Sequence, residues 1–231
     1  SVLYYGNAAA PMATGTFNAS TNPNSVYYNS AGNQLIKNGT YYHLLLTGGG
    51  TKTPTGGDVT VNGNLTIDHG ITLDHTTLNV NVAGNITNSG TCTSTTGEVR
   101  ITGGSAQHQL FGTGSYQLLR LNDANGALMN GSFTVNGTLT IQTGNFNIGA
   151  NTLTLNNPVA TSPNNLYGGA TSSLVLNGSA AYTLSSNCMT MNNLTLNSTG
   201  NFAYPAGGPY TLDINGTLNL KIGRASCRER V

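Results

Sequence analysis

The feature that most constrains the fold of this chain is an internal 75-residue repeat. Residues 41–46 (YYHLLL) align with 116–121 (YQLLRL) and with 191–196 (MNNLTL), at two equal steps along the chain. A second phrase, VNGNLTI at 61–67, returns as VNGTLTI at 135–141 and as INGTLNL at 214–220. Repetition at a near-constant period is typical of folds whose units stack and bury their apolar faces against their neighbours.

Within one unit, the apolar residues recur with a period of two. They come in pairs with one Thr or Asn between the two members, and Gly and Asn separate one pair from the next. Alternation of this kind indicates short strands with one buried face and one solvated face. Gly and Asn are residues that favour turns. The pairs of one unit are Phe133 and Val135, Leu139 and Ile141, Phe146 and Ile148, and Leu153 and Leu155.

Two all-β topologies fit short strands with frequent turns. Asn-Gly between strands is a hairpin signal, which favours an antiparallel β-sandwich array. The apolar pairs, however, span only three residues, which is shorter than an average strand of about 5–6 residues. A three-sided coil of such short strands and their turns needs about 20 residues, and Val135 to Leu155 covers that length. We therefore predict a right-handed parallel β-helix (β-solenoid) of about three 75-residue units over 1–220, with outward Thr and Asn in ladders along the rod.

The composition supports an all-β chain and excludes several other classes. Thr (34), Asn (32) and Gly (31) together make up more than two fifths of the 231 residues, and only 6% of the residues are charged. Ordinary soluble domains carry about 25% charged residues, and helical bundles need Glu, Lys, Leu and Ala in quantity. The sequence has no run of 18 apolar residues, so no membrane-spanning segment is predicted. This composition is typical of extracellular β proteins.

The end of the chain differs from the rest. Residues 221–231 (KIGRASCRERV) contain four of the eight Lys and Arg residues, and they resemble a translated sequencing adapter. We interpret them as an artefactual tail and residues 1–220 as an internal fragment of a longer protein. Residues 1–220 then hold four basic and six acidic side chains, a net charge of −2. Nucleic-acid binding needs clustered Lys and Arg, so nucleic acid is excluded as a partner.

Few residues are candidates for chemistry. Asp68-His69 and Asp74-His75 are weak candidates for a metal site, because imidazole and carboxylate are suitable ligands for zinc and similar ions. The pattern occurs in only one unit, so a solvated turn is the preferred interpretation. His43 and His108 are predicted to lie at the surface. No residue is predicted to be catalytic or to bind a cofactor.

Cys92 and Cys188 are expected to be isolated buried thiols, although a disulfide between them stays open. The remaining acids, Asp58, Glu98, Asp123 and Asp213, are far apart in the sequence, which disfavours the paired carboxylates of a glycosidase. Outward Thr pairs such as Thr138 and Thr140 could match an ice lattice, but the aligned positions in the other units include Asn. Exposed tyrosines could stack on sugar rings; the candidates are Tyr27, Tyr28, Tyr41, Tyr42 and Tyr116.

Three phrases carry a resemblance to a known group of proteins. They are NGTYYHL at 38–44, TGGGTKT at 47–53 and VTVNGNLTI at 59–67. They resemble the repeat units of large secreted β-solenoid surface proteins of Gram-negative bacteria, many of which carry a type IX secretion signal. The resemblance covers essentially all of 1–220. It implies an adhesin-like protein and supplies no catalytic motif.

The expected function is therefore a structural or adhesive segment of a secreted or cell-surface bacterial repeat protein, without catalysis and without a cofactor. Its expected location is extracellular or on the outer cell surface. Its expected partners are surface glycans, other cell-surface proteins and neighbouring repeats of the parent chain. The alternative is a carbohydrate-binding or polysaccharide-cleaving β-helix protein, with ice binding as a lesser one.

Overall fold

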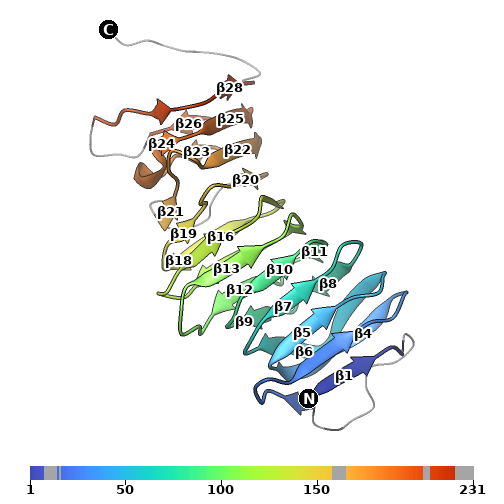
Figure 1. Cartoon of the computed structure of the whole chain (residues 1–231). Coiled ribbons are helices and arrows are strands. Elements are labelled where there is room, and N and C mark those ends of the chain that lie inside the picture. The colour runs from blue at the N-terminus through green and yellow to red at the C-terminus, as the bar shows by residue number, and fades with distance from the viewer. Residues whose placement is uncertain (8–14, 16, 158–164, 205–208, 222–231) are drawn as a thin grey trace.

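The computed structural model describes residues 1–7, 15, 17–157, 165–204 and 209–221. The chain is all-β, only 2% helical, and winds into a β-solenoid of about 10 turns (Figure 1). Every strand pair among the described residues is parallel. The predicted parallel β-helix is therefore confirmed, and the alternative of an antiparallel sandwich is wrong.

The strands form three stacks, which we call faces I, II and III, and the chain from β3 to β18 passes through them in that order. Face I is a nine-stranded sheet made of β1 (Val2–Tyr5), β3 (Ser25–Tyr28), β5 (His43–Leu46), β7 (Leu65–Ile67), β10 (Ile86–Asn88), β13 (His108–Phe111), β16 (Ala127–Met129), β19 (Phe146–Asn147) and β21 (Leu166–Tyr167).

Faces II and III belong to one 15-stranded sheet, because β4 (Gln34–Tyr41) and β6 (Thr51–Val61) continue around the corner between them. The first part of β6 pairs with β8 and its last part pairs with β9. After β4 and β6, face II continues with β8 (Thr72–Thr76), β11 (Thr91–Ser94), β14 (Ser115–Tyr116), β17 (Phe133–Val135), β20 (Thr152–Leu155), β22 (Ser173–Gly178), β25 (Asn193–Ser198) and β28 (Leu218–Leu220). Face III has β2 (Asn18–Ala19), β9 (Val80–Val82), β12 (Val99–Thr102), β15 (Leu119–Asn122) and β18 (Leu139–Thr143).

The last described coils contain two short parallel pairs and one turn of 3₁₀ helix. β23 (Tyr182–Thr183) pairs with β26 (Phe202–Ala203), and β24 (Thr190–Met191) pairs with β27 (Asp213–Ile214). The helix η2 (Ser186–Cys188) begins after Ser185, whose side chain accepts a hydrogen bond from the amide of Asn187. The expected tail, 221–231, lies outside the described residues apart from Lys221.

Successive coils stack in register. Leu73 pairs with Cys92, Leu174 with Leu194, and Thr91 with Ser115, so the length of one turn varies modestly from coil to coil. Because the pairing keeps alternate residues inside, the inward side chains form a single apolar core from Ala19 to Leu196. At about 4.8 Å per coil, ten turns give a rod of roughly 50 Å.

The 75-residue repeat does not coincide with a whole number of coils. The aligned segments form β5 on face I, β15 on face III and β25 on face II. From β5 to β15 the chain passes eleven strand positions, with β6 counted twice because it lies on two faces. Eleven is not a multiple of three, so aligned segments of successive units lie on different faces.

The Asn62-Gly63 and Asn136-Gly137 pairs lie at corners of the coil and not at hairpin turns. The amide of Gly63 donates to the carbonyl of Tyr42 in the preceding coil (2.7 Å), and the amide of Gly137 donates to Gln117 (2.8 Å). A Cβ on Gly137 would lie 2.3 Å from that carbonyl oxygen. Neither glycine has the positive φ that a type I′ hairpin turn requires. These glycines are therefore needed because two coils approach closely, which is why the hairpin signal was misleading.

The predicted ladder of Asn side chains exists at the end of face II. Asn156 Nδ2 donates to Asn136 Oδ1 (2.8 Å), Asn177 donates to Asn156 (2.8 Å), and Asn197 donates to Asn177 (3.2 Å). Four coils are thus joined by side chains as well as by the backbone. Stacked amides suit this place because each can donate to one neighbour and accept from the other.

Candidate functional site

Of the two Asp-His pairs, the weak metal candidates, one lies at a turn and the other on a strand. Asp68 and His69 are exposed at the turn between β7 and β8. On β8, Asp74 is half-buried and His75 is fully buried, because successive residues of a strand face opposite sides. The four side chains therefore do not converge. The described residues contain no group of three or more His, Cys, Asp and Glu side chains that could hold a metal ion.

His75 is part of the core. Its Nδ1 lies 2.9 Å from the carbonyl oxygen of Leu78, to which it donates. Burial lowers the pKa of His75, although the hydrogen bond to Leu78 and the charge of Asp74 act in the opposite direction. The ring therefore favours the neutral state and has a structural place in the fold.

His108 is also buried, with 1% of its surface exposed, so its predicted place at the surface is wrong. It begins β13 and lies between two coils. Its Nδ1 is 2.7 Å from the carbonyl oxygen of Gly84, and its Nε2 is 3.1 Å from Oδ2 of Asp123. Both ring nitrogens are thus engaged, so neither is available as a general base for a substrate.

A second ionic group lies on face III. Glu98 bonds to Arg120 through both carboxylate oxygens (2.7 Å each) and to Nε of Arg100 (2.8 Å). Arg100 and Arg120 are stacked neighbours in register, so Glu98 offsets the repulsion between them. Burial raises the pKa of Glu98, but the two arginines outweigh that effect and lower the pKa overall. The carboxylate of Glu98 is therefore ionised, and both of its oxygens are occupied by the two arginines.

Lys52 is a fully buried lysine near the N-terminal end of the core. Its Nζ donates to the carbonyl of Ser30 (2.8 Å), to the carbonyl of Gly32 (3.3 Å) and to Oε1 of Gln34 (3.1 Å). All three donors of an ammonium group are thus used. Burial lowers the pKa of Lys52.

The two cysteines of 1–220 are buried free thiols, as expected. Cys188 donates from Sγ to the carbonyl of Leu166 (3.3 Å), and burial raises the pKa of Cys188 to about 12. Burial also raises the pKa of Cys92. Neither thiol favours the reactive thiolate form.

Three of the five tyrosines considered for sugar stacking belong to the core. Tyr28, Tyr41 and Tyr116 are fully buried, whereas Tyr27 and Tyr42 are partly exposed. The hydroxyl of Tyr41 donates to the carbonyl of Lys37 (2.5 Å) and lies 2.9 Å from the hydroxyl of Tyr28. These three rings therefore fill the core and are not available to a sugar.

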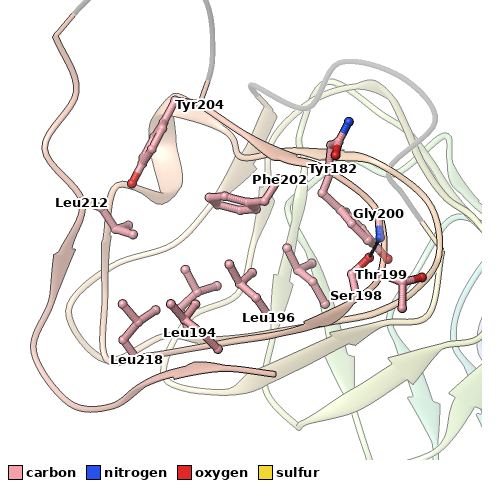
Figure 2. Close-up of a pocket in the computed structure, with 13 residues that line it drawn as sticks. Tyr182, Leu194, Leu196, Ser198, Thr199, Gly200, Phe202, Tyr204, Leu212 and Leu218 are labelled. Carbon is pink, nitrogen blue, oxygen red and sulfur yellow. Dashed lines mark hydrogen bonds between the residues drawn. The ribbon is translucent and has the colours of Figure 1, made fainter. Parts of the chain in front are cut away.

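A cavity lies at the C-terminal end of the core. Figure 2 shows Leu194, Leu196 and Leu218 on one wall, with Phe202 and Leu212 across from them. Its volume is about 430 Å³. The hydroxyl of Ser198 on its polar side already accepts from the amide of Gly200 (3.0 Å) and bonds to the carbonyl of Ala180 (3.2 Å). The cavity is thus an apolar continuation of the core and presents no reactive constellation.

The outer surface of face II is built from small polar side chains. Six hydroxyl residues of successive coils pair in one column, and each is partly exposed. A shallow groove of about 470 Å³ follows the start of these strands on four coils, with His69 at one end. The column consists of Thr51, Thr72, Thr91, Ser115, Thr134 and Thr154.

Sequence reasoning missed the ionic contacts because their partners are about one coil apart. Glu98 and Arg120 are separated by 22 residues, and this spacing, close to the length of one coil, is the signal that could have paired them. His108 and Asp123 are separated by only 15 residues, which is shorter than a coil, so no such signal pairs them. The 75-residue alignment hides this spacing.

Comparison of the chain with models of protein families gives no match, and none is found among curated proteins or solved structures. Within the part of the chain that the structure describes, no helix is long and apolar enough to cross a membrane.

Proposed function

We propose that this chain is a non-catalytic structural segment of a secreted or cell-surface repeat protein, a stiff spacer that also offers adhesive contacts. The observation that supports this best is the continuity of the rod. One apolar core runs from Ala19 to Leu196, and parallel pairing joins each described coil to the next. A spacer needs such continuity, because a load is carried only as far as neighbouring coils are bonded.

The outer surface agrees with this function. Side-chain ladders such as Asn136 to Asn197 add bonds between coils without adding charge. The carboxylates of Glu98 and Asp123 are occupied by partners within the chain. The low charge, the abundance of Thr and Asn, and the resemblance to secreted surface proteins of Gram-negative bacteria support a place outside the cell, with type IX secretion as the route. Surface glycans, other cell-surface proteins and neighbouring repeats are the proposed partners.

Single-molecule pulling between the two ends tests the spacer. We expect resistance followed by stepwise release, each coil of about 20 residues adding roughly 70 Å of extended chain. The core variant Leu121→Ala should lower the resisting force, since large-to-small changes in a core cost about 2–5 kcal/mol. A change on the outer side of β6, Thr60→Ala, is the matched control, because Thr60 is only partly buried. Extension without measurable resistance contradicts the spacer.

A panel of polysaccharides and a glycan array test the rest of the proposal. We expect no release of new sugar ends from the polysaccharides, and at most weak binding to many different glycans on the array. Cleavage of any polysaccharide would replace the proposal with the enzymatic alternative. Saturable binding of one sugar would make the chain a carbohydrate-binding protein, and a purely structural role would be wrong.

Ice binding is a second candidate, favoured by the hydroxyl column of face II. The stacked strands space these hydroxyls by about 4.8 Å, and the column has no charge. The 75-residue alignment concealed it, because coils and not units set the register. Inhibition of ice recrystallisation tests this candidate: Thr91→Tyr in the column should abolish it, and Thr60→Tyr on face III should not. If the unmodified chain leaves recrystallisation unchanged, ice binding is excluded.

A further inference from the structure

The chain contains seven Asn-Gly pairs, the dipeptide that most readily loses its asparagine amide without an enzyme. The glycine amide nitrogen attacks the carboxamide carbon of the asparagine, because glycine has no side chain that blocks the approach. The reaction needs a glycine nitrogen that can give up its proton and a main chain that can turn toward the carboxamide. The pairs begin at Asn38, Asn62, Asn125, Asn130, Asn136, Asn177 and Asn215.

The three pairs that the 75-residue repeat aligns are locked by hydrogen bonds between coils. In each pair, the glycine amide donates to a main-chain carbonyl of the preceding coil, at 2.7 to 2.8 Å. An amide that donates such a bond keeps its proton, and its nitrogen can attack only after the two coils have separated locally. The three donors are Gly63, Gly137 and Gly216.

Three further pairs are restrained in other ways. The amide of Gly126 donates to the carbonyl of Asp123 within its own turn (3.0 Å). Asn38-Gly39 lies within β4 and Asn177-Gly178 within β22, and both glycines pair with a residue of the adjacent strand. The carboxamides of these two pairs are bonded as well, that of Asn38 to the carbonyl of Gly56 (3.2 Å) and that of Asn177 within the ladder.

The pair Asn130-Gly131 differs from the other six. It lies at the corner 130–132, between β16 and β17. Asn130 is exposed and Gly131 is partly exposed, whereas Gly63 and Gly137 are buried. Among the described residues, the amide of Gly131 has no hydrogen-bond acceptor. The carboxamide of Asn130 bonds at the surface, where its Nδ2 donates to Oε1 of Gln109 (2.6 Å).

The packing explains why this corner has glycine and yet leaves its amide unbonded. A Cβ on Gly131 would lie 2.2 Å from the carbonyl oxygen of Gly112 in the preceding coil, so the close approach of the coils requires glycine. The bond to the preceding coil is made one residue earlier, where the amide of Asn130 donates to Leu110 (2.7 Å). At the Asn136 corner, both amides of the pair are bonded to the preceding coil. At the Asn130 corner, the nucleophilic nitrogen stays accessible to solvent.

We propose that Asn130-Gly131 is a self-modification site, at which the folded rod converts Asn130 into aspartate or isoaspartate while the other Asn-Gly pairs are protected. Hydroxide takes the amide proton of Gly131, and the nitrogen attacks Cγ of Asn130. The N–Cγ bond forms, the Cγ–Nδ2 bond breaks, and Nδ2 takes a proton from water and leaves as ammonia. Water then opens the cyclic imide at either carbonyl. The product carries one new carboxylate at this corner. This inference is independent of the proposed function.

Incubation of the unmodified, folded chain at mildly alkaline pH tests the site. Peptide mapping by mass spectrometry gives the loss of each asparagine with time. We expect Asn130 to lose its amide about 10-fold faster or more than Asn62 and Asn136, because each of those pairs must first break a hydrogen bond between coils. The same chain unfolded in guanidinium chloride gives the rates that the local sequence alone sets. There, the advantage of Asn130 should disappear.

Two matched variants check the assignment by a second measurement. Amide loss adds one negative charge, so ion-exchange chromatography of the folded chain follows the reaction directly. Asn130→Gln should abolish the early acidic species, because glutamine forms its larger imide ring far more slowly. Asn62→Gln changes another exposed asparagine and should leave the acidic species unchanged. The proposal is overturned if Asn130 in the folded chain reacts no faster than Asn62 and Asn136, or if its advantage is equally large in the unfolded chain.

Discussion

Replacing Gly137 by alanine tests the interpretation of the Asn-Gly corners. The new Cβ would lie 2.3 Å from the carbonyl oxygen of Gln117 and 3.0 Å from Cδ2 of Leu118. Ordinary contacts begin at about 3.4 Å, so the coils would have to separate locally by about 1 Å out of about 4.8 Å. The 2.8 Å bond from the amide of Gly137 to Gln117 would then be lost.

The expected change in the free energy of unfolding follows from these two effects, and a control variant isolates a third. Loss of the backbone hydrogen bond costs about 0.5–1.5 kcal/mol, and overpacking costs about 1–3 kcal/mol. A glycine-to-alanine change also stabilises by about 0.4–1 kcal/mol through the unfolded chain. Gly169 has no atom within 4 Å of the place where its Cβ would be, and its φ is not positive. Gly169→Ala therefore shows the unfolded-state effect alone.

Urea unfolding followed by far-UV circular dichroism gives the free energy of unfolding of both variants. Gly169→Ala should raise the free energy of unfolding slightly, and Gly137→Ala should lower it. Because the unfolded-state effect is common to both, the difference between the variants should be about 1.5–4.5 kcal/mol. Equal m-values would show that the same structure unfolds in both. If the two variants differ by less than about 0.5 kcal/mol, close approach of the coils is not the reason for glycine at this corner.

Three further changes test the contacts between coils. Asn177→Ala removes two ladder bonds and should lower the free energy of unfolding by about 1–3 kcal/mol. Asn197→Ala removes one ladder bond and should have about half that effect. Equal effects of the two variants would contradict the ladder. The pKa of Glu98 is lowered in the folded chain, so its stabilisation is present above the ordinary glutamate pKa and is lost as pH falls through the lowered value. Glu98→Gln should remove that dependence and cost about 1 kcal/mol, less at high salt; a pH profile identical to that of the unmodified chain would refute this. The pKa of Lys52 is lowered on folding, so the unfolded chain binds more protons and stability should rise with pH between the lowered value and the ordinary lysine value. Lys52→Met should abolish that rise in urea titrations at several pH values, and its persistence would assign it to another group.

The period-two pattern predicted the fold because it reports directly on burial. In the parallel rod, Phe133, Val135, Leu139 and Ile141 are all inside, as their alternation with polar residues requires. Coil length was also predictable, since three short strands and their corners need about 20 residues. The course of the chain around the three faces was not predictable from the 75-residue repeat, because eleven strand positions bring aligned segments to different faces.

The ionic contacts could not be predicted from the sequence, for a related reason. His108 occupies a place where the alternation gives an inward position, yet a histidine alone is usually assigned to the surface. Its burial depends on Asp123 from the next coil, and that partnership depends on a corner that is longer than its neighbours. Only a register established coil by coil shows which residues meet there.

Corners and strands have separate tasks in this rod. The strands keep the alternation that builds the core, and their register is maintained even past the long 103–107 corner, where Ile86 still pairs with Leu110 and His108 with Ala127. Asp58, Glu98 and Asp123 lie at corners or strand ends, where they bond to donors of adjacent coils. A charge in mid-strand would face its counterpart one coil away, and like charges there repel. A corner can take an ionisable residue or extra length without disturbing the stack, so specific chemistry in a rod of this kind is to be sought at its corners.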